Sequence, residues 1–346
     1  MTAGPAAPPA PSAARRTGRG RPLWLLAAAA ALLALMFASI AVGSREVPWS
    51  ALTAAFGGPV DGFDQAAVAK RVPRTLLAVL AGAALGLSGA VMQGVTRNPL
   101  ADPGILGVNM GASLAVVAGI AFFGLTSATG FVWAAIAGAG ATAAFVYAVG
   151  SLGRGGATPL KLALAGAATS AALASFISAV VLPRNDIAGG VRSWQIGGVG
   201  GGTFEGVAQV LPFILAGAVV CLLSARGLDL LALGDDLAAG LGARVAAARA
   251  AASLGAVVLC GATTALTGPI AFVGLVVPHA VRLLVGGGHR WLLPLSALTG
   301  AALLTAADVV GRIAVRPAEI DVGIVTALIG APFFIHIVRR RKVREL

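Results

Sequence analysis

The sequence predicts an all-α integral membrane protein with about ten transmembrane helices and both termini in the cytoplasm. Of its 346 residues, 58% are hydrophobic and only 11% are charged, whereas soluble domains are about a quarter charged. The charged residues lie between long apolar runs. The 48 glycines suit helices that pack closely in lipid through small side chains.

The chain divides into a short tail, residues 1–22, and a transmembrane domain, residues 23–346. The tail is rich in Pro, Ala and Arg, a composition that predicts a disordered, basic, cytoplasmic segment. Its arginines precede an apolar run at 23–42, which is long enough to cross a membrane. This start also resembles a secretory signal with a twin arginine. A signal anchor is favoured, because many further apolar segments follow.

Nine further apolar segments follow the first one. They lie near residues 75–93, 107–124, 131–150, 162–182, 207–225, 245–266, 270–285, 291–310 and 322–338. The break between the seventh and eighth spans rests on the short sequence Thr267, Gly268 and Pro269, which is typical of a helix end. Small residues four apart, such as Gly82 and Gly86, predict close contact between helices.

The net charge of +12 follows the predicted topology. With both termini inside, roughly two thirds of the Lys and Arg fall in cytoplasmic segments, as the positive-inside rule expects. There is no basic stripe interleaved with aromatic residues, and the sequence has one Tyr, which argues against nucleic-acid binding. Cys221 and Cys260 lie inside apolar runs with no metal-ligand spacing, so both are interpreted as core residues.

Several ordered motifs carry a resemblance to a known family. They are RVPRTL at 71–76, GAVMQ at 89–93, NPLADPGILG at 98–107, GPIAFVGLVVPH at 268–279 and TALIGAPFF at 326–334. Their order along the chain resembles the iron-siderophore and cobalamin permeases of ATP-binding-cassette (ABC) importers, the FecCD type. Several long blocks in consistent order are far more specific than one short motif.

The resemblance implies a non-catalytic permease subunit with a cobalamin-permease-like bundle in the bacterial cytoplasmic membrane. Its implied partners are two ATPase subunits, which bind ATP and Mg, an extracytoplasmic substrate-binding protein, and a second permease subunit in a homo- or heterodimer. No cofactor is expected in this chain, which has no GxxxxGK[ST] motif of its own for holding nucleotide phosphates. The implied cargo is an iron-siderophore-type chelate, with cobalamin or haem as alternatives.

Three arginines are candidates for docking the binding protein. Arg71 and Arg74 precede the second span, three residues apart around a Pro that suits the start of a helix, so both guanidiniums are expected to face the external solvent. Arg312 follows the ninth span. The resemblance assigns these three positions to pairing with carboxylates of the binding protein; the alternative is solvated interfacial charge. No matched motif supports Arg316.

The loop between Arg226 and Arg244 predicts a short helix. Asp235 or Asp236 can cap its start, Leu237 and Leu241 share one face, and Gly242 can end it. The resemblance identifies this helix as the one that couples the permease to the ATPase, with residues Asp235, Asp236, Leu237, Gly240, Leu241 and Gly242. Without the resemblance, a surface helix lying on the bundle is the simpler interpretation.

Two further groups are interpreted as structural. Asn98, Pro99, Asp102 and Pro103 have strong turn chemistry, in a loop that could also touch the ATPase. Asp308 is the one carboxylate near the end of an apolar span, and Arg312 four residues later offers it an ion-pair partner.

One residue departs from the family pattern. Asp321 stands where the family usually carries Pro after Glu319 and Ile320. The departure leaves the geometry at the entry to the last helix open.

Two functions from other classes compete with a permease. An intramembrane serine protease would need Ser88, in the GLSG sequence at 86–89, to meet a base such as His279. An ion-coupled secondary transporter would place carboxylates near the membrane midplane, but acids other than Asp308 are absent from the predicted spans. Both are disfavoured.

Overall fold

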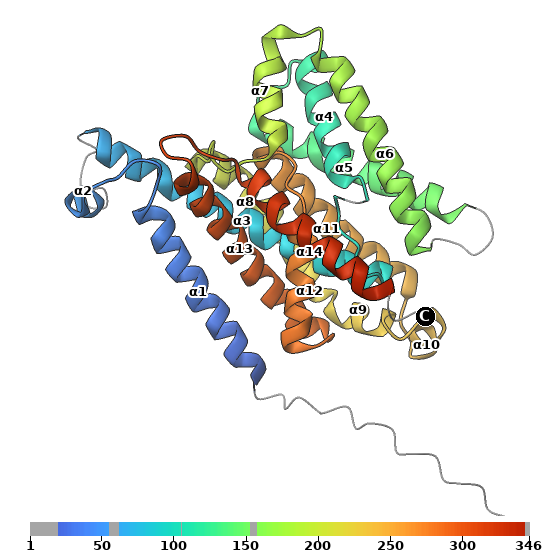
Figure 1. The fold of residues 1–346 in the computed structure, drawn as a ribbon. Coiled ribbons are helices and arrows are strands. Elements are labelled where there is room, and N and C mark those ends of the chain that lie inside the picture. The colour runs from blue at the N-terminus through green and yellow to red at the C-terminus, as the bar shows by residue number, and fades with distance from the viewer. Residues whose placement is uncertain (1–19, 55–61, 105, 153–157, 343–346) are drawn as a thin grey trace, which may run out of the picture.

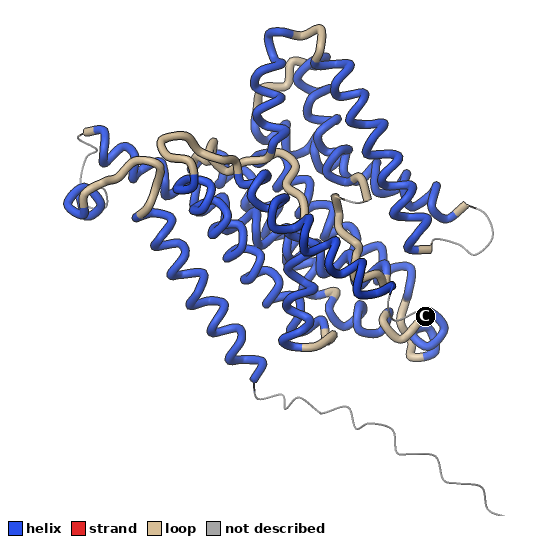
Figure 2. The backbone as a smooth tube through the Cα atoms, in the orientation of Figure 1, coloured by secondary structure: helices blue, strands red, loops and turns tan. Residues whose placement is uncertain are grey.

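The computed structural model describes residues 20–54, 62–104, 106–152 and 158–342. Within these ranges the chain forms helices joined by loops, with no strand (Figure 2). The prediction of an all-α protein is therefore confirmed. Nearly all of the predicted tail, residues 1–19, lies outside the described residues, as do the four C-terminal residues.

Seven helices are long and apolar enough to cross a membrane. They are α1 (Arg21–Ala41), α3 (Phe63–Thr96), α5 (Ala128–Ser151), α6 (Pro159–Val181), α8 (Phe204–Leu223), α11 (Val245–Thr267) and α13 (His289–Ala314). Three helices with shorter apolar segments are α4 (Val108–Phe123), α12 (Val273–Val285) and α14 (Val322–Lys342). Each of these ten helices overlaps one of the ten predicted spans. Their individual crossing of the membrane and the cytoplasmic placement of both termini stay predictions.

The remaining helices of the described chain are short and lie at the two ends of the bundle. They are α2 (Trp49–Ala54), α7 (Asn185–Ile196), α9 (Ala225–Leu231) and α10 (Asp235–Gly240). In Figure 1, α9 and α10 lie at the end where α1 begins, whereas α2 and the end of α1 lie at the opposite end. These ends are called the α10 side and the α2 side below.

Helix α3 runs through the centre of the bundle and packs directly against α13. At Gly82 a Cβ would collide with the backbone of Gly300, and at Gly86 it would collide with the carbonyl of Ser296. Close backbone approach of this kind is how helices associate in lipid. The predicted row of small residues is thus confirmed as a helix contact.

The start of α3 differs from the prediction. The second span was expected to begin near residue 75, but the helix begins at Phe63 and contains Pro73 in its interior. Proline removes one backbone hydrogen bond. The preceding turns remain helical because they are packed: Val68 and Arg71 are both buried. Arg71 and Arg74 therefore lie within a helix and not before one.

The predicted break after the seventh span is confirmed. Helix α11 ends at Thr267, and Gly268 follows with a φ of +67°, where a Cβ would also collide with the carbonyl of Trp194. Both conditions favour glycine. The chain then turns at Phe272 into α12.

Candidate functional site

Arg71 lies at the α2 side and holds the end of α1. Its guanidinium donates hydrogen bonds to the carbonyls of Ile40 at 3.1 Å, Ala41 at 3.0 Å and Arg45 at 2.7 Å. The last carbonyls of a helix have no partner within the helix, and a cation there also suits the helix dipole. Arg71 is only 6% exposed, so its N–H donors stabilise the fold by holding the end of α1.

Arg312 reaches the same end of α1 from α13. It donates to the carbonyls of Ser39 at 2.8 Å and Val42 at 3.0 Å, and to the Ser39 hydroxyl at 2.6 Å. It is 1% exposed. Two buried arginines from two different helices therefore fasten the end of α1 to the bundle.

Asp308 lies between two guanidiniums. Its Oδ2 is 3.0 Å from Arg312 Nη2, which confirms the predicted pairing four residues apart, and its Oδ1 is 2.8 Å from Arg74 Nη2. Sequence spacing could not reveal the second contact, because the two residues are 234 positions apart. The buried carboxylate is thus neutralised by charge-assisted hydrogen bonds from Arg74 and by the ion pair with Arg312.

Glu319 closes this group toward the solvent. It lies 2.6 Å from Arg74 Nη1 and accepts a hydrogen bond of 2.7 Å from the Ser44 hydroxyl. Burial alone would raise the pKa of Glu319, but the hydrogen bonds from Ser44 and Arg74 outweigh it and lower the pKa. At Asp321, burial dominates and raises the pKa, despite the charge of Arg74.

The three predicted docking arginines are brought together in one place. With Asp308 and Glu319 they form what is called the arginine cluster below. The expectation that Arg71 and Arg74 both face the external solvent is wrong: Arg71 is buried against α1, and the Arg74 side chain is 14% exposed. Docking itself stays a prediction for Arg71, Arg74 and Arg312.

Arg316 lies outside the arginine cluster. It is partly exposed and pairs at 3.3 Å with Glu46. At Asp321, the departure from the family pattern does not prevent α14 from beginning directly afterwards, at Val322. The carbonyl of Asp321 accepts the hydrogen bond from Ile324 in the first turn.

The predicted short helix exists on the α10 side as α10. Its end is as expected: Gly242 has a φ of +82°, and the N–H groups of Gly242 and Ala243 donate to the carbonyls of Ala239 and Ala238, which is a Schellman motif. Its start differs, because Gly234 occupies the N-cap position and no side chain caps the helix.

Asp235 has another role than capping. Its Oδ1 lies 2.9 Å from Arg97 Nη2 and 3.0 Å from Arg249 Nη2. Its carboxylate is therefore held by two charge-assisted contacts to guanidiniums and caps no backbone N–H of α10. The next carboxylate, Asp236, is exposed.

The outward face of α10 is apolar. Leu237 is 63% exposed and Leu241 is 64% exposed, whereas Ala238 between them is completely buried. Gly240 is also exposed. The helix therefore rests on the bundle through one face and presents two leucines on another, as the sequence predicted.

The turn chemistry predicted after α3 is confirmed. The Asn98 carboxamide oxygen accepts a hydrogen bond of 3.0 Å from the N–H of Leu100, and the Asp102 carboxylate accepts one of 2.7 Å from the N–H of Gly104. Such local bonds fix a turn. Asp102 is buried and Asn98 is partly buried.

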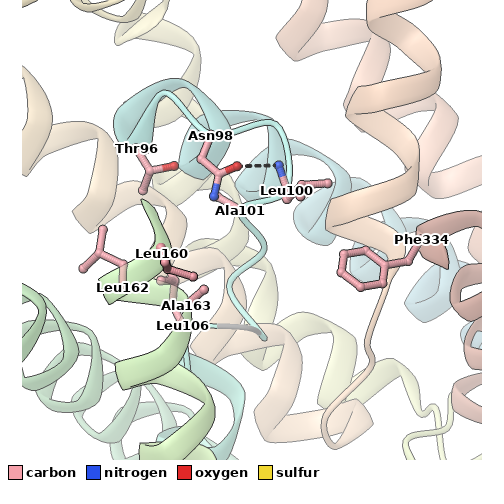
Figure 3. Close-up of a pocket in the computed structure, with 9 residues that line it drawn as sticks. All are labelled: Thr96, Asn98, Leu100, Ala101, Leu106, Leu160, Leu162, Ala163 and Phe334. Atoms are coloured by element: carbon pink, nitrogen blue, oxygen red, sulfur yellow. Dashed lines mark hydrogen bonds between the residues drawn. The ribbon is translucent and has the colours of Figure 1, made fainter. Parts of the chain in front are cut away.

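A cavity of about 270 Å³ lies beside this turn, between the end of α3, the start of α6 and α14. Figure 3 shows Phe334 facing the turn across the opening, with Leu160 and Leu162 on the α6 wall. Its two polar residues bond locally: Thr96 donates to the carbonyl of Met92, and Asn98 accepts from Leu100. The walls are therefore mostly apolar, and spacing in the sequence did not indicate this cavity.

The residues of the disfavoured serine-protease alternative have other neighbours. The Ser88 hydroxyl donates to the carbonyl of Leu85 and lies 3.3 Å from the thiol of Cys260. The His279 ring packs edge-on against Phe333. Cys221 and Cys260 are free and buried, as predicted.

Comparison with known proteins agrees with this architecture. The FecCD transport family model matches residues 31–340. The ferric enterobactin transport system permease protein FepD of Escherichia coli (strain K12) is 46% identical over 305 residues, covering 88% of this chain and 91% of that protein. The cobalamin import system permease protein BtuC of Halobacterium salinarum is 41% identical over 314 residues, covering 89% and 84%.

A solved structure shares the fold. It is an inward-facing conformation of a metal-chelate type ABC transporter, with a TM-score of 0.77 and 30% sequence identity, covering 92% of this chain and 99% of that chain. The number of apolar helices and these matches indicate a multi-pass membrane protein. A match over so much of the sequence shows that the chain belongs to the FecCD transport family.

Proposed function

We propose that this chain is the permease subunit of an ABC importer that moves an iron-siderophore-type chelate across the bacterial cytoplasmic membrane. The observation that carries the proposal is α10, a helix fastened to the bundle through Asp235 and Ala238 that presents Leu237 and Leu241 away from it. In this proposal the α10 side is cytoplasmic and the α2 side is extracytoplasmic.

The energy comes from partner subunits. Two ATPase subunits bind ATP and Mg, and this chain is non-catalytic and holds no cofactor of its own. Leu237 and Leu241 enter an apolar cleft of the ATPase, with Asp235, Asp236, Gly240 and Gly242 shaping the helix that presents them. Burial of two exposed leucines would stabilise the contact by about 1.5–3 kcal/mol per side chain.

The binding protein docks on the α2 side at the arginine cluster. Its five members carry three positive and two negative charges, so a partner with surface carboxylates is favoured. Arg74 is the member that faces both a buried carboxylate and an outer one, Glu319. Carboxylates of the binding protein would meet Arg74 there, while Arg71 and Arg312 hold the end of α1 beneath the docking surface.

The route for the cargo lies between two permease subunits. The cavity of about 270 Å³ is smaller than a typical pocket for a drug-sized ligand, about 300–1,000 Å³. A bulky chelate therefore needs a passage that a second copy or a related permease completes. Mostly apolar walls suit passage, because a transported ligand must be held weakly enough to leave.

Uptake into proteoliposomes tests this function. The permease is reconstituted with its ATPase and binding protein, and labelled ferric siderophore, haem and cobalamin are compared with and without ATP. We expect ATP-dependent uptake of the ferric siderophore. Uptake of cobalamin, the cargo of the named H. salinarum relative, or of haem would keep the class and change the substrate.

Uptake that follows an ion gradient and ignores ATP would contradict the ABC mechanism in favour of a secondary transporter. The surroundings of Asp308 argue against that outcome. Its carboxylate already pairs with Arg74 and Arg312, so it is poorly suited to binding and releasing a coupling ion.

A further inference from the structure

Helices α9 and α10, with the turns that follow each of them, form a compact unit on the α10 side, called the α9–α10 segment (residues 225–242). It lies at the end of the bundle where α1 begins (Figure 1) and packs against α3, α11 and α13. Leu228 and Leu231 of α9 are fully buried, whereas Leu237 and Leu241 are exposed. The segment thus has one face in the bundle and one face open.

Asp235 ties this segment to two spanning helices. Its partner Arg97 ends α3 in a left-handed conformation with a φ of 51°, and its partner Arg249 lies in the second turn of α11. Arg249 approaches both oxygens of the carboxylate, at 3.0 and 3.3 Å. One carboxylate therefore joins α10, α3 and α11.

Asp229 ties the segment to a third spanning helix. Its Oδ1 accepts a hydrogen bond of 2.9 Å from the N–H of His289, the first residue of α13, and lies 2.7 Å from Nδ1 of the same residue. A carboxylate at a helix start also suits the helix dipole. The His289 ring is buried against α3, since a Cβ at Gly94 would lie 2.7 Å from its Nε2.

These contacts converge on helices that already pack together. Helix α3 touches α13 backbone to backbone at Gly82 and Gly86, and the four residues Arg97, Asp235, Arg249 and Asp229 come from α3, α10, α11 and α9. A displacement of the leucine face would therefore be carried by short, directional, charge-assisted bonds to three central helices at once.

We propose that Asp235, with Arg97 and Arg249, is a positioning group that transmits motion between the ATPase and helices α3 and α11, and that Asp229 does the same for α13. The proposal rests on the proposed function, because it takes Leu237 and Leu241 as the ATPase contact. Asp235 itself need not touch the ATPase. Its side chain faces two arginines of its own chain.

Transmission of motion by Asp235 can be distinguished experimentally from simple stabilisation of the fold. Arg97 and Asp235 are each about half exposed, and exposed ion pairs contribute little to stability because water screens them. Their loss should therefore leave the bundle folded and the leucine face in place. What it should change is the link between ATP hydrolysis and movement of the helices.

The test uses the complete transporter in proteoliposomes. Asp235→Asn is compared with wild type for ATPase association, for stimulation of ATP hydrolysis by loaded binding protein, and for cargo moved per ATP hydrolysed. We expect association to stay within twofold while cargo per ATP falls at least fivefold and the stimulation is lost. The conservative Asp235→Glu should restore most of both, because it keeps the charge.

The two arginines supply matched controls. Arg97→Gln with Arg249→Gln should reproduce the effect of Asp235→Asn, and adding Asp235→Asn to that pair should cause little further loss, since residues in one network are not additive. Arg226→Gln removes one positive charge from an exposed arginine of the same segment. It should leave cargo per ATP within twofold of wild type.

The outcomes separate the two proposals. A wild-type complex with no ATPase association or no ATP-dependent uptake would contradict the proposed function and this inference together. A working wild type in which Asp235→Asn leaves cargo per ATP and stimulation unchanged would overturn this inference alone. A variant that loses thermal stability, association and uptake in proportion, without rescue by Asp235→Glu, would also overturn it in favour of a structural role.

Discussion

The arginine cluster on the α2 side and the α9–α10 segment on the opposite side use charge differently. In the arginine cluster, the guanidiniums contact groups of the same subunit, namely the end of α1 and Asp308. In the α9–α10 segment, charged groups fasten one face and leave apolar side chains exposed on the other. On the α10 side, the surface open to a partner is therefore mainly apolar. On the α2 side, most of the charged groups are buried in contacts within the subunit.

The largest effect should come from removing Asp308, the buried carboxylate of the arginine cluster. Asp308→Asn leaves the buried Arg312 without its countercharge and leaves Arg74 paired with Glu319 alone; breaking a buried ion pair typically costs about 3–5 kcal/mol. We expect a large fall in the free energy of unfolding, measured by denaturant titration in detergent. As a control, Asp186→Asn breaks an exposed pair with Arg184 and should change stability little. Equal stability of Asp308→Asn and wild type would contradict the claim that Asp308 stabilises the arginine cluster.

The sequence predicted the bundle well because its signals were local. Apolar runs, the break at Gly268 and the helix end at Gly242 each depend on a few adjacent residues, and the structure has them where expected. The start of α3 was misplaced because Pro73 looks like a helix start, and only packing of the preceding turns overrides it. The chain alone did not indicate that packing.

The candidate sites were harder to predict because they depend on distant contacts. The family resemblance assigned Arg71, Arg74 and Arg312 to one docking surface, but it did not indicate that their donors reach α1 and Asp308. Asp235 or Asp236 was expected to cap the start of α10. The actual partners of Asp235, Arg97 and Arg249, lie outside that helix, 138 and 14 positions away. Only the fold brings such groups together.

On the α10 side, replacing the exposed leucines should impair coupling without unfolding the chain. The double variant Leu237→Asp, Leu241→Asp places two charges where we propose an apolar cleft of the ATPase. We expect ATP-dependent uptake to fall more than tenfold, and the thermal unfolding midpoint to stay near wild type because both side chains are mostly exposed.

The volume-conserving variant Leu237→Met, Leu241→Met is the matched control. It should retain most of the uptake. Full coupling in the aspartate variant would move the ATPase contact to another loop, the turn at Asn98 being the first to test.

A smaller effect is expected for docking on the α2 side. Arg74→Glu also places a second carboxylate beside the buried Asp308, so it is measured on folded preparations. There it should weaken association with the binding protein several-fold at low salt, and the difference should shrink as the ionic strength rises, because salt screens charge attraction. Surface plasmon resonance on the permease in nanodiscs measures both. Arg316→Glu, outside the arginine cluster, should have a weaker effect. Docking that is unchanged by Arg74→Glu at low salt would exclude Arg74 from the contact.

The smallest effect concerns pH at the edge of the arginine cluster. Because the folded-state pKa of Glu319 is lowered by its bonds to Ser44 and Arg74, the stability it contributes is present above its ordinary pKa. That stability is lost as pH falls through the lowered value. When the pH is lowered from 7 to below about 4, the ordinary pKa of Glu, the thermal unfolding midpoint of Glu319→Gln should fall less than that of wild type. Identical pH profiles would show that the Arg74–Glu319 contact adds no stability.

A cysteine crosslink tests the central claim, the ATPase contact through the exposed face of α10, most directly. Both native cysteines are buried, so a maleimide-benzophenone photo-crosslinker attached to one introduced thiol can report on that position by inserting into C–H bonds of whatever contacts it. With the ATPase bound, Leu237→Cys should crosslink to that subunit, and Ala238→Cys on the buried face should not. Crosslinking at neither position, in a complex that still imports its cargo with ATP, would contradict the account.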